Sequence, residues 1–281
     1  MIHDPKPIEL VPELRKSIDR MLWYVPGINS VQSYENYLVD DLLYSEAIIE
    51  IILDELNMNK DQDVKIANEK ILDKEDVSFY ESNICIKCQK IILTKMKNES
   101  ILRAMLRHIR NGIAHGNFTT IGSLVLFIDQ NKNGKTALLK IDVIAFEKII
   151  NLIEKYDELT EGKVLAKAFE KLGYEVKKEF RVGDIVLDLL IIKDGSKYGV
   201  EIKSEKRSKL VGFQDNMIIQ LLNANQTLKE QSITPVFIYD KSRVSNKAKN
   251  YLLGKGIILL DRKNISELID NVDILRKSNK D

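Results

Sequence analysis

The stretch VLDLLIIKDGSKYGVEIKS, residues 186–204, decides how the second half of this chain folds. Two apolar runs flank the dipeptide Asp194-Gly195, and an Asp-Gly pair between apolar runs is a strong signal for a two-residue hairpin turn. We therefore predict two antiparallel strands in which Lys193 pairs with Ser196. The turn fixes the register of every other pair along the two strands.

This register brings two acidic side chains together. Counting back from the turn, Asp188 pairs with Glu201, and paired residues share one face of a sheet with Cβ atoms roughly 5 Å apart. Lys203 lies two residues beyond Glu201 and so shares that face. Because neighbouring carboxylates repel each other and an unpaired charge in an apolar strand is costly, a divalent cation would stabilise both; oxygen ligands favour Mg²⁺ or Mn²⁺. The alternative is a salt-bridged trio on the solvent face of the sheet.

The surrounding pattern predicts a second domain over residues 160–281. Its expected elements follow the order α-β-β-β-α-β-α-β-α, which indicates a mixed sheet with helices on its faces. The first helix ends at Gly173, and a long helix follows the acidic hairpin over about residues 208–230. The fold class predicted for this domain is therefore α/β.

The hairpin resembles the core of the PD-(D/E)xK, or restriction-endonuclease-like, nuclease superfamily. The signature of that superfamily is an acid on one strand and an acid-x-Lys on the next, here Asp188 and Glu201-Ile202-Lys203. The element order over residues 160–281 is also similar to that fold. The resemblance implies metal-dependent hydrolysis of phosphodiester bonds, with Asp188 and Glu201 as metal ligands and Lys203 as a catalytic residue.

Several further residues are candidates on the same resemblance, although the proline of the signature is absent. Glu161 would be an additional acid on the first helix, and Gln220, in preference to Gln214, would be a polar residue on the helix after the lysine. Asp184 competes weakly with Asp188 as the first acid. The basic segment that follows the second strand would hold a nucleic-acid backbone, or would be a solvated loop; its candidates are Lys206, Arg207 and Lys209.

The first domain, residues 1–159, has a different pattern. Apolar residues recur at helical spacing through residues 8–110, which predicts a helical bundle. Its expected pieces include helices near residues 62–73 and 77–97. Two later runs, residues 123–129 and 136–143, predict a hairpin because Asn133-Gly134 stands between them.

A polar group lies near the end of one predicted helix, in the sequence RNGIAHG of residues 110–116. Five residues turn a helix by roughly 140° from Arg110 to His115, so the two side chains would not share a face. Asn111 and His115 would share one, being four residues apart. Arg110 and His115 can meet if the helix distorts at Gly112, or if a second copy of the domain faces the first across a two-fold axis.

RNGIAHG is similar to the Rx4–6H motif of HEPN domains, which are helical bundles. This resemblance implies a homodimer whose two motifs form one ribonuclease site that needs no metal. His115 would act as general acid and base toward the 2′-OH, Arg110 would stabilise the charged phosphate, and Asn111 would orient both. The alternatives are a module that binds or dimerises without cutting, and a chance match at a helix C-terminus. His108 is expected to have no functional role.

The gross properties fit a cytoplasmic protein. No apolar run approaches the ~18 residues of a membrane span, and no signal peptide is recognisable at the start. The only cysteines, Cys85 and Cys88, lack the second pair that a structural zinc site needs, so we expect reduced core cysteines. Residues 1–160 hold 20 Lys and Arg against 25 Asp and Glu, whereas residues 161–281 hold 23 against 17, which favours a polyanion partner for the second domain.

Together these features predict a cytoplasmic nuclease that acts on DNA, RNA or both, with metal-dependent hydrolysis in the second domain and a first domain that dimerises the protein and could also cut RNA. The two family resemblances, and no single residue, imply a role in prokaryotic defence against foreign nucleic acid. Two other hypotheses stay open. In one, the first domain is a metal-independent ribonuclease and the second only binds nucleic acid. In the other, the protein is a non-enzymatic adaptor.

Overall fold

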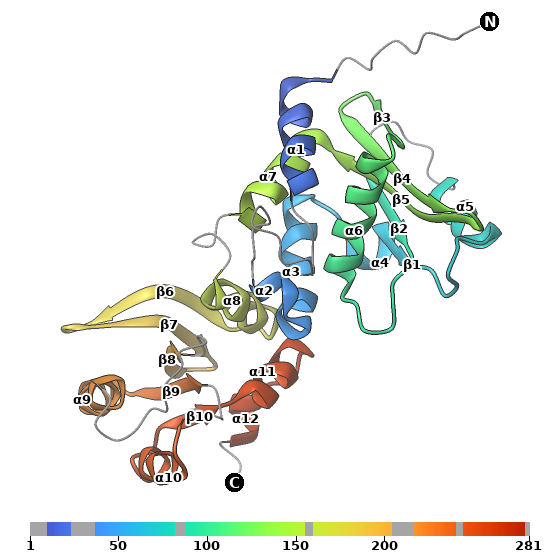
Figure 1. The fold of residues 1–281 in the computed structure, drawn as a ribbon. Coiled ribbons are helices and arrows are strands. Elements are labelled where there is room, and N and C mark those ends of the chain that lie inside the picture. Colours follow the sequence, from blue (N-terminus) through green and yellow to red (C-terminus); the bar gives the residue numbers. More distant parts are fainter. Residues whose placement is uncertain are drawn as a thin grey trace, which may run out of the picture. The chain divides into compact units, whose positions relative to one another are not determined.

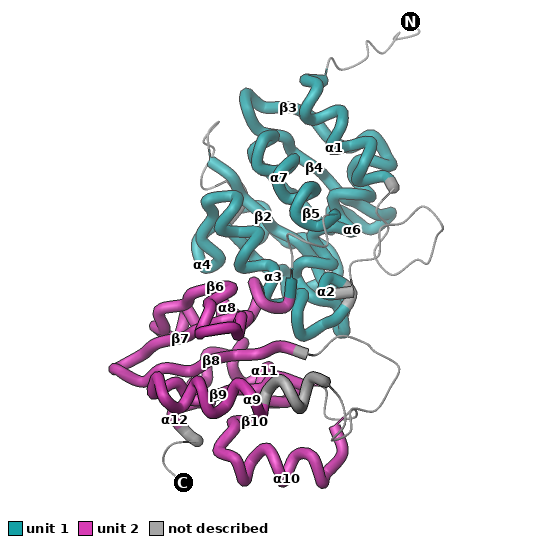
Figure 2. Tube along the Cα trace, turned by 90° about the vertical axis from the view of Figure 1, so that its left-hand side faces the viewer, with its two compact units in different colours: residues 1–160 teal, residues 161–281 magenta. Residues whose placement is uncertain are grey.

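A computed structural model describes residues 10–23, 37–81, 88–154, 160–203, 216–239 and 244–278. The chain divides into two compact units, residues 1–160 and residues 161–281 (Figure 2). In the part of the chain that the structure describes, no helix combines the length and the apolar character that a membrane crossing needs.

The first unit combines helices with a mixed five-stranded sheet of order β1-β2-β5-β4-β3. The strands are β1 (Val64–Ile66), β2 (Lys90–Leu93), β3 (Phe118–Ile121), β4 (Leu124–Asn131) and β5 (Gly134–Asp142). The helices are α1 (Pro12–Trp23), α2 (Tyr37–Asp40), α3 (Leu42–Glu55), α4 (Lys60–Asp63), α5 (Lys74–Glu81), α6 (Ile101–Ala114) and α7 (Val143–Glu154). Helix α6 packs on β4, and α1 and α3 contact both α6 and α7, so these helices form a layer beside the sheet (Figure 1).

This sheet corrects the prediction of a helical bundle. The late hairpin is confirmed as β4 and β5, but helices predicted near residues 62–73 and 77–97 are wrong where β1 and β2 lie. All four residues of β2 are buried, and a short run of buried residues has no periodicity that separates strand from helix. Its strand conformation comes from pairing with β5, where Ile91 lies opposite Leu139, far along the chain.

Helix α6 is well delimited by its sequence. Ser100 caps its N-terminus, because the Ser100 Oγ accepts the backbone N–H of Arg103 at 3.1 Å. The helix runs without interruption through Gly112 to a C-cap at His115. A Cβ at Gly112 would lie 3.3 Å from the carbonyl oxygen of Ile128, so the glycine allows α6 to lie close against β4.

The second unit is built on a mixed sheet of order β10-β9-β8-β7-β6. Its elements follow the predicted order up to the last strand, but the single closing helix that we predicted is two helices in the structure. The strands are β6 (Glu175–Val182), β7 (Ile185–Lys193), β8 (Ser196–Lys203), β9 (Ile233–Tyr239) and β10 (Ile258–Leu260). The helices are α8 (Glu161–Lys171), α9 (Asn216–Glu230), α10 (Asn246–Gly254), α11 (Arg262–Ile269) and α12 (Ile274–Ser278). Helices α9 and α10 lie on one side of the sheet, and α8 and α11 on the other (Figure 1).

The hairpin of β7 and β8 has the predicted register. Lys193 pairs with Ser196, and the ladder continues back to the pair of Leu189 and Val200. Both residues of the turn, Asp194-Gly195, have positive φ, at 49° and 79°. A two-residue turn with positive φ at both positions matches the twist of the flanking strands, which explains why this dipeptide determined the register correctly.

Candidate functional site

Three polar side chains lie along one face of α6. Arg107, Asn111 and His115 are spaced four residues apart, so they follow one another on the helix surface. All three line a pocket with a volume of about 550 Å³. Because residues four apart share one face of a helix, all three side chains reach the same pocket.

Two loops form other parts of the pocket wall, and the parallel pairing of β1 with β2 explains why they meet. Parallel strands end at the same edge of a sheet, so the segments that follow them, residues 68–70 and 94–97, leave the sheet side by side. Both segments line the pocket and bring three lysines to it, Lys70, Lys95 and Lys97. A pocket with several cationic side chains suits an anionic ligand.

Arg107 is held in place by Glu99. The Arg107 Nε and Nη2 donate to the two carboxylate oxygens of Glu99, each at 2.8 Å. Burial would raise the pKa of the Glu99 carboxyl, but hydrogen bonds from Arg107 and from the backbone N–H of Met96 outweigh it and hold that pKa below its usual range. This two-point contact fixes the plane of the guanidinium beside the pocket.

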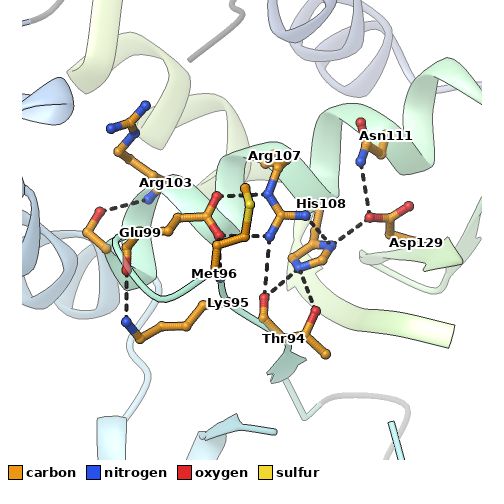
Figure 3. A network of polar contacts seen from close by, with 10 residues as sticks. Thr94, Lys95, Met96, Glu99, Arg103, Arg107, His108, Asn111 and Asp129 are labelled. Atoms are coloured by element: carbon orange, nitrogen blue, oxygen red, sulfur yellow. Dashed lines mark hydrogen bonds and ion pairs between the residues drawn. The ribbon is translucent and has the colours of Figure 1, made fainter. Parts of the chain in front are cut away.

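A buried pair, His108 and Asp129, adjoins the pocket, and Asp129 is one of the residues that line it. Figure 3 shows the polar contacts of this pair. The His108 Nδ1 lies 2.6 Å from the Asp129 Oδ2, and its Nε2 lies 2.7 Å from the carbonyl oxygen of Thr94. Asn111 donates through its Nδ2 to the same Asp129 oxygen at 3.1 Å. Burial would raise the pKa of Asp129, but the hydrogen bonds from His108 and Asn111 lower it below its ordinary value.

Sequence reasoning missed this pair. His108 is completely buried, although we expected no role for it, and Asp129 drew no attention within its strand. The spacing of His108 and Asn111 on α6 was a usable signal, since residues three apart are neighbours on a helix. Their common partner on β4 was not visible, because that contact depends on how helix and sheet pack.

The structure separates Arg110 from the predicted partners. Asn111 and His115 line the pocket together, whereas Arg110 does not contribute to its wall. The helix shows no distortion at Gly112 that would bring Arg110 and His115 together. The Arg110 Nε is buried and has no hydrogen-bond partner among the residues that the structure describes.

In the second unit the strands separate where the two predicted acids lie. The ladder of β7 and β8 ends just before Asp188 and Glu201, and the Asp188 Oδ2 accepts the backbone N–H of Ile202 at 2.6 Å. Both acids are half-buried. Mg²⁺ is commonly held by one or two carboxylates together with waters and substrate phosphates, so the side-chain chemistry of these two acids suits such an ion. No group of three or more His, Cys, Asp or Glu side chains suited to a metal exists within the described ranges.

The remaining predicted residues fall in different places. Asp184 is exposed in the turn between β6 and β7, away from Asp188. Glu161 is buried at the start of α8, and Gln220 lies on α9. Lys203 ends β8 and pairs with β9 at Tyr239. The predicted residues that lie outside the described parts of the chain are Cys85, Lys206, Arg207, Lys209 and Gln214.

One family model matches about half of the chain. The family model described as HEPN pEK499 p136 matches residues 21–164, which contain the α6 pocket. No curated protein matches the chain.

Solved structures give weaker likenesses. The protein of unknown function AF1548 is 22% identical over 36% of this chain and 56% of its own, with a TM-score of 0.32. A repair endonuclease from Pyrococcus abyssi is 14% identical over 52% and 65%, with a TM-score of 0.29. Protein VC1899 from Vibrio cholerae is 8% identical over 96% and 57%, with a TM-score of 0.35. The chain thus spans less than two thirds of each of these proteins, and TM-scores this low decide neither its fold nor its function.

Proposed function

The chain belongs to the HEPN pEK499 p136 family, and from this premise we propose that it is a nuclease whose α6 pocket cleaves RNA. One observation carries the proposal: Arg107, Asn111 and His115 lie on one face of α6 and line a single pocket together with lysines. That set combines a group able to transfer protons with groups able to hold a phosphate.

The chemistry follows from these side chains. Histidine is the side chain that most readily exchanges protons near neutral pH, and His115 is exposed, so a substrate can reach it. In the proposed reaction His115 takes the proton of a ribose 2′-OH, whose oxygen attacks the adjacent phosphorus. The bond from phosphorus to the 5′-oxygen breaks, His115 returns the proton to that oxygen as general acid, and a 2′,3′-cyclic phosphate remains. Arg107 stabilises the negative charge on the phosphate.

The lysines of the two loops bind the rest of the substrate. Lys70, Lys95 and Lys97 line the pocket away from the helix, where they would neutralise phosphates on either side of the bond that is cut. Contacts of this kind hold a nucleic-acid backbone without reading its sequence. RNA is the substrate because the proposed nucleophile is the 2′-OH, which DNA lacks.

Arg110 would join the site from a second copy. Within one chain it lies outside the pocket wall, and its buried Nε has no partner among the described residues. Buried polar atoms are nearly always hydrogen-bonded, so the Arg110 side chain would gain a partner for this atom by turning outward toward another molecule. We therefore propose a homodimer through the first unit, in which Arg110 of one copy reaches the phosphate held by the other.

A second candidate activity rests on the register of β7 and β8. Asp188 and Glu201 each lie next to the last pair of the ladder, Leu189 with Val200, and the Asp188 Oδ2 accepts the backbone N–H of Ile202. In this proposal the two carboxylates would hold Mg²⁺ or Mn²⁺. When bound, such an ion polarises a phosphate and activates a water for hydrolysis. Lys203 would stabilise the developing charge, Glu161 and Gln220 are further candidates, and Lys206, Arg207 and Lys209 would bind the DNA or RNA backbone. A cytoplasmic role in prokaryotic defence completes the proposal.

One assay grid separates the two activities. Labelled RNA and DNA are incubated with wild type, His115→Ala and Glu201→Ala, each in EDTA or in Mg²⁺. We expect RNA cleavage in EDTA to fall by about 10²- to 10⁴-fold in His115→Ala, as is usual for loss of a general acid or base, and to persist in Glu201→Ala. Cleavage that needs Mg²⁺ should show the reverse pattern: it should be lost in Glu201→Ala and persist in His115→Ala. The activity that each variant keeps shows that the variant was not inactivated by general unfolding.

Two outcomes would contradict the proposal. RNA cleavage in EDTA that survives in His115→Ala would remove the α6 pocket from the chemistry. Binding of RNA and DNA without cleavage of either, under both conditions, would favour the non-enzymatic adaptor.

A further inference from the structure

The buried pair of His108 and Asp129 is not explained by packing alone. His108 is fully buried and Asp129 is 6% exposed, yet Asp129 also forms part of the pocket wall. Burying an ion pair brings little net stability, because the loss of hydration offsets the attraction. Because burial of these two groups costs hydration free energy and they lie next to the residues proposed for catalysis, we expect a functional role for them.

The protons of the pair follow from the atoms that face each ring nitrogen. The His108 Nε2 faces the carbonyl oxygen of Thr94, which only accepts, so Nε2 carries a proton. The Nδ1 lies 2.6 Å from the Asp129 carboxylate, which also accepts, so a proton lies between them. Asp129 is therefore held from one side by a ring that is itself fixed at both nitrogens.

This arrangement determines how the amide of Asn111 is oriented. A carboxylate can only accept, so Asn111 must direct its Nδ2 group to Asp129, and the 3.1 Å contact is of that kind. The amide oxygen then points away from the carboxylate (Figure 3). Without Asp129 the amide could rotate by half a turn and exchange donor for acceptor.

We propose that His108 and Asp129 are positioning residues that lock the Asn111 amide so that its oxygen serves as a hydrogen-bond acceptor at the α6 pocket. Such an acceptor recognises a donor, and the ribose 2′-OH of RNA is the donor that distinguishes RNA from DNA. The role assigned to this pair rests on the proposed RNA cleavage at His115. It adds that recognition of the hydroxyl depends on His108 and Asp129, which orient the Asn111 amide.

The first test does not depend on activity. In wild type, the NMR signals of the Asn111 side-chain amide, assigned by their loss in Asn111→Ala, should show slow exchange with solvent. Asp129→Asn is nearly isosteric but can present either a donor or an acceptor, so the amide signals should shift and exchange faster. Unchanged signals in Asp129→Asn would overturn the proposal.

The second test measures RNA cleavage by the same variant. A misplaced catalytic group costs up to about 10²-fold in rate, so kcat should fall by about 10- to 100-fold in Asp129→Asn while KM stays within about twofold. His108→Gln, which leaves Asp129 in place without its ring partner, should lower kcat in the same direction. The control is Glu154→Gln, which breaks the ion pair with Arg20 in the same unit but outside the pocket wall; its kcat should match wild type.

The outcomes are distinct. Amide signals that change while kcat stays at the wild-type value would show that the pair is only structural. If His115→Ala keeps full RNA cleavage, the proposed function fails, whereas loss of activity in His115→Ala with full activity in both Asp129→Asn and His108→Gln would overturn the positioning role alone.

Discussion

At the scale of single residues, Asp129 organises the polar side chains at the α6 pocket. One of its oxygens accepts hydrogen bonds from both His108 and Asn111. A buried carboxylate is stable only when donors replace the water that it has lost. The ionised form of Asp129 is therefore linked to the folded state, and its contribution to stability must depend on pH.

The change Asp129→Asn should make this linkage visible. Because the pKa of Asp129 is lowered in the folded state, its stabilising effect is complete above the unfolded value of about 3.9 and is lost as the pH falls through the folded value. At pH 7 we expect wild type to exceed Asp129→Asn by about 3 kcal/mol in the free energy of unfolding, since one partner of a buried pair is removed. Urea unfolding measured at pH 7 and near pH 3 checks this; a difference that stays constant between them would refute the linkage.

At the scale of elements, local chemistry explains which parts of the structure were predictable. The hairpin of β7 and β8 follows from its own turn, and the shared face of Asn111 and His115 follows from helical spacing. Strand β2 was missed because its partner β5 lies more than forty residues further along the chain. Asp129 was missed for a related reason, since only the packing of α6 on β4 brings it to His108.

The sheet of the second unit has a glycine position where an added methyl group would force neighbouring side chains to shift. A Cβ on Gly199, in β8, would lie 2.9 Å from the Leu187 Cδ1 and 3.1 Å from the Ile233 Cγ2. Overpacking of this kind costs about 1–3 kcal/mol, so Gly199→Ala should lower the urea midpoint by the corresponding amount.

Gly254→Ala is the matched control for that change. Gly254 ends α10, no atom lies within 4 Å of its added Cβ, and its φ is not positive. Alanine there should be neutral or stabilising by up to about 1 kcal/mol, because it restricts the unfolded chain. Equal destabilisation by both substitutions would mean that the close contacts at Gly199 do not limit the size of the side chain.

At the scale of the whole molecule, the two candidate centres belong to different units and use different residues. The α6 pocket lies within residues 1–160, and the pair of Asp188 and Glu201 lies within residues 161–281. The second unit also carries the excess of basic residues. One chain thus offers a proton-transfer site and an oxygen-ligand site, and losing one should leave the other intact.

The assembly of the first unit can be tested by mixing inactive variants. If Arg110 acts on the phosphate held by another copy, a dimer of one Arg110→Ala chain and one His115→Ala chain retains one site with both residues intact. An equal mixture after subunit exchange contains such dimers as about half of its molecules, each with one of two sites active, so about a quarter of the wild-type RNA cleavage in EDTA should return. Each variant alone, exchanged with itself, is the control and should stay inactive. If the mixture stays inactive although sedimentation shows that mixed dimers have formed, Arg110 and His115 must act within one chain, which the uninterrupted course of α6 through Gly112 argues against.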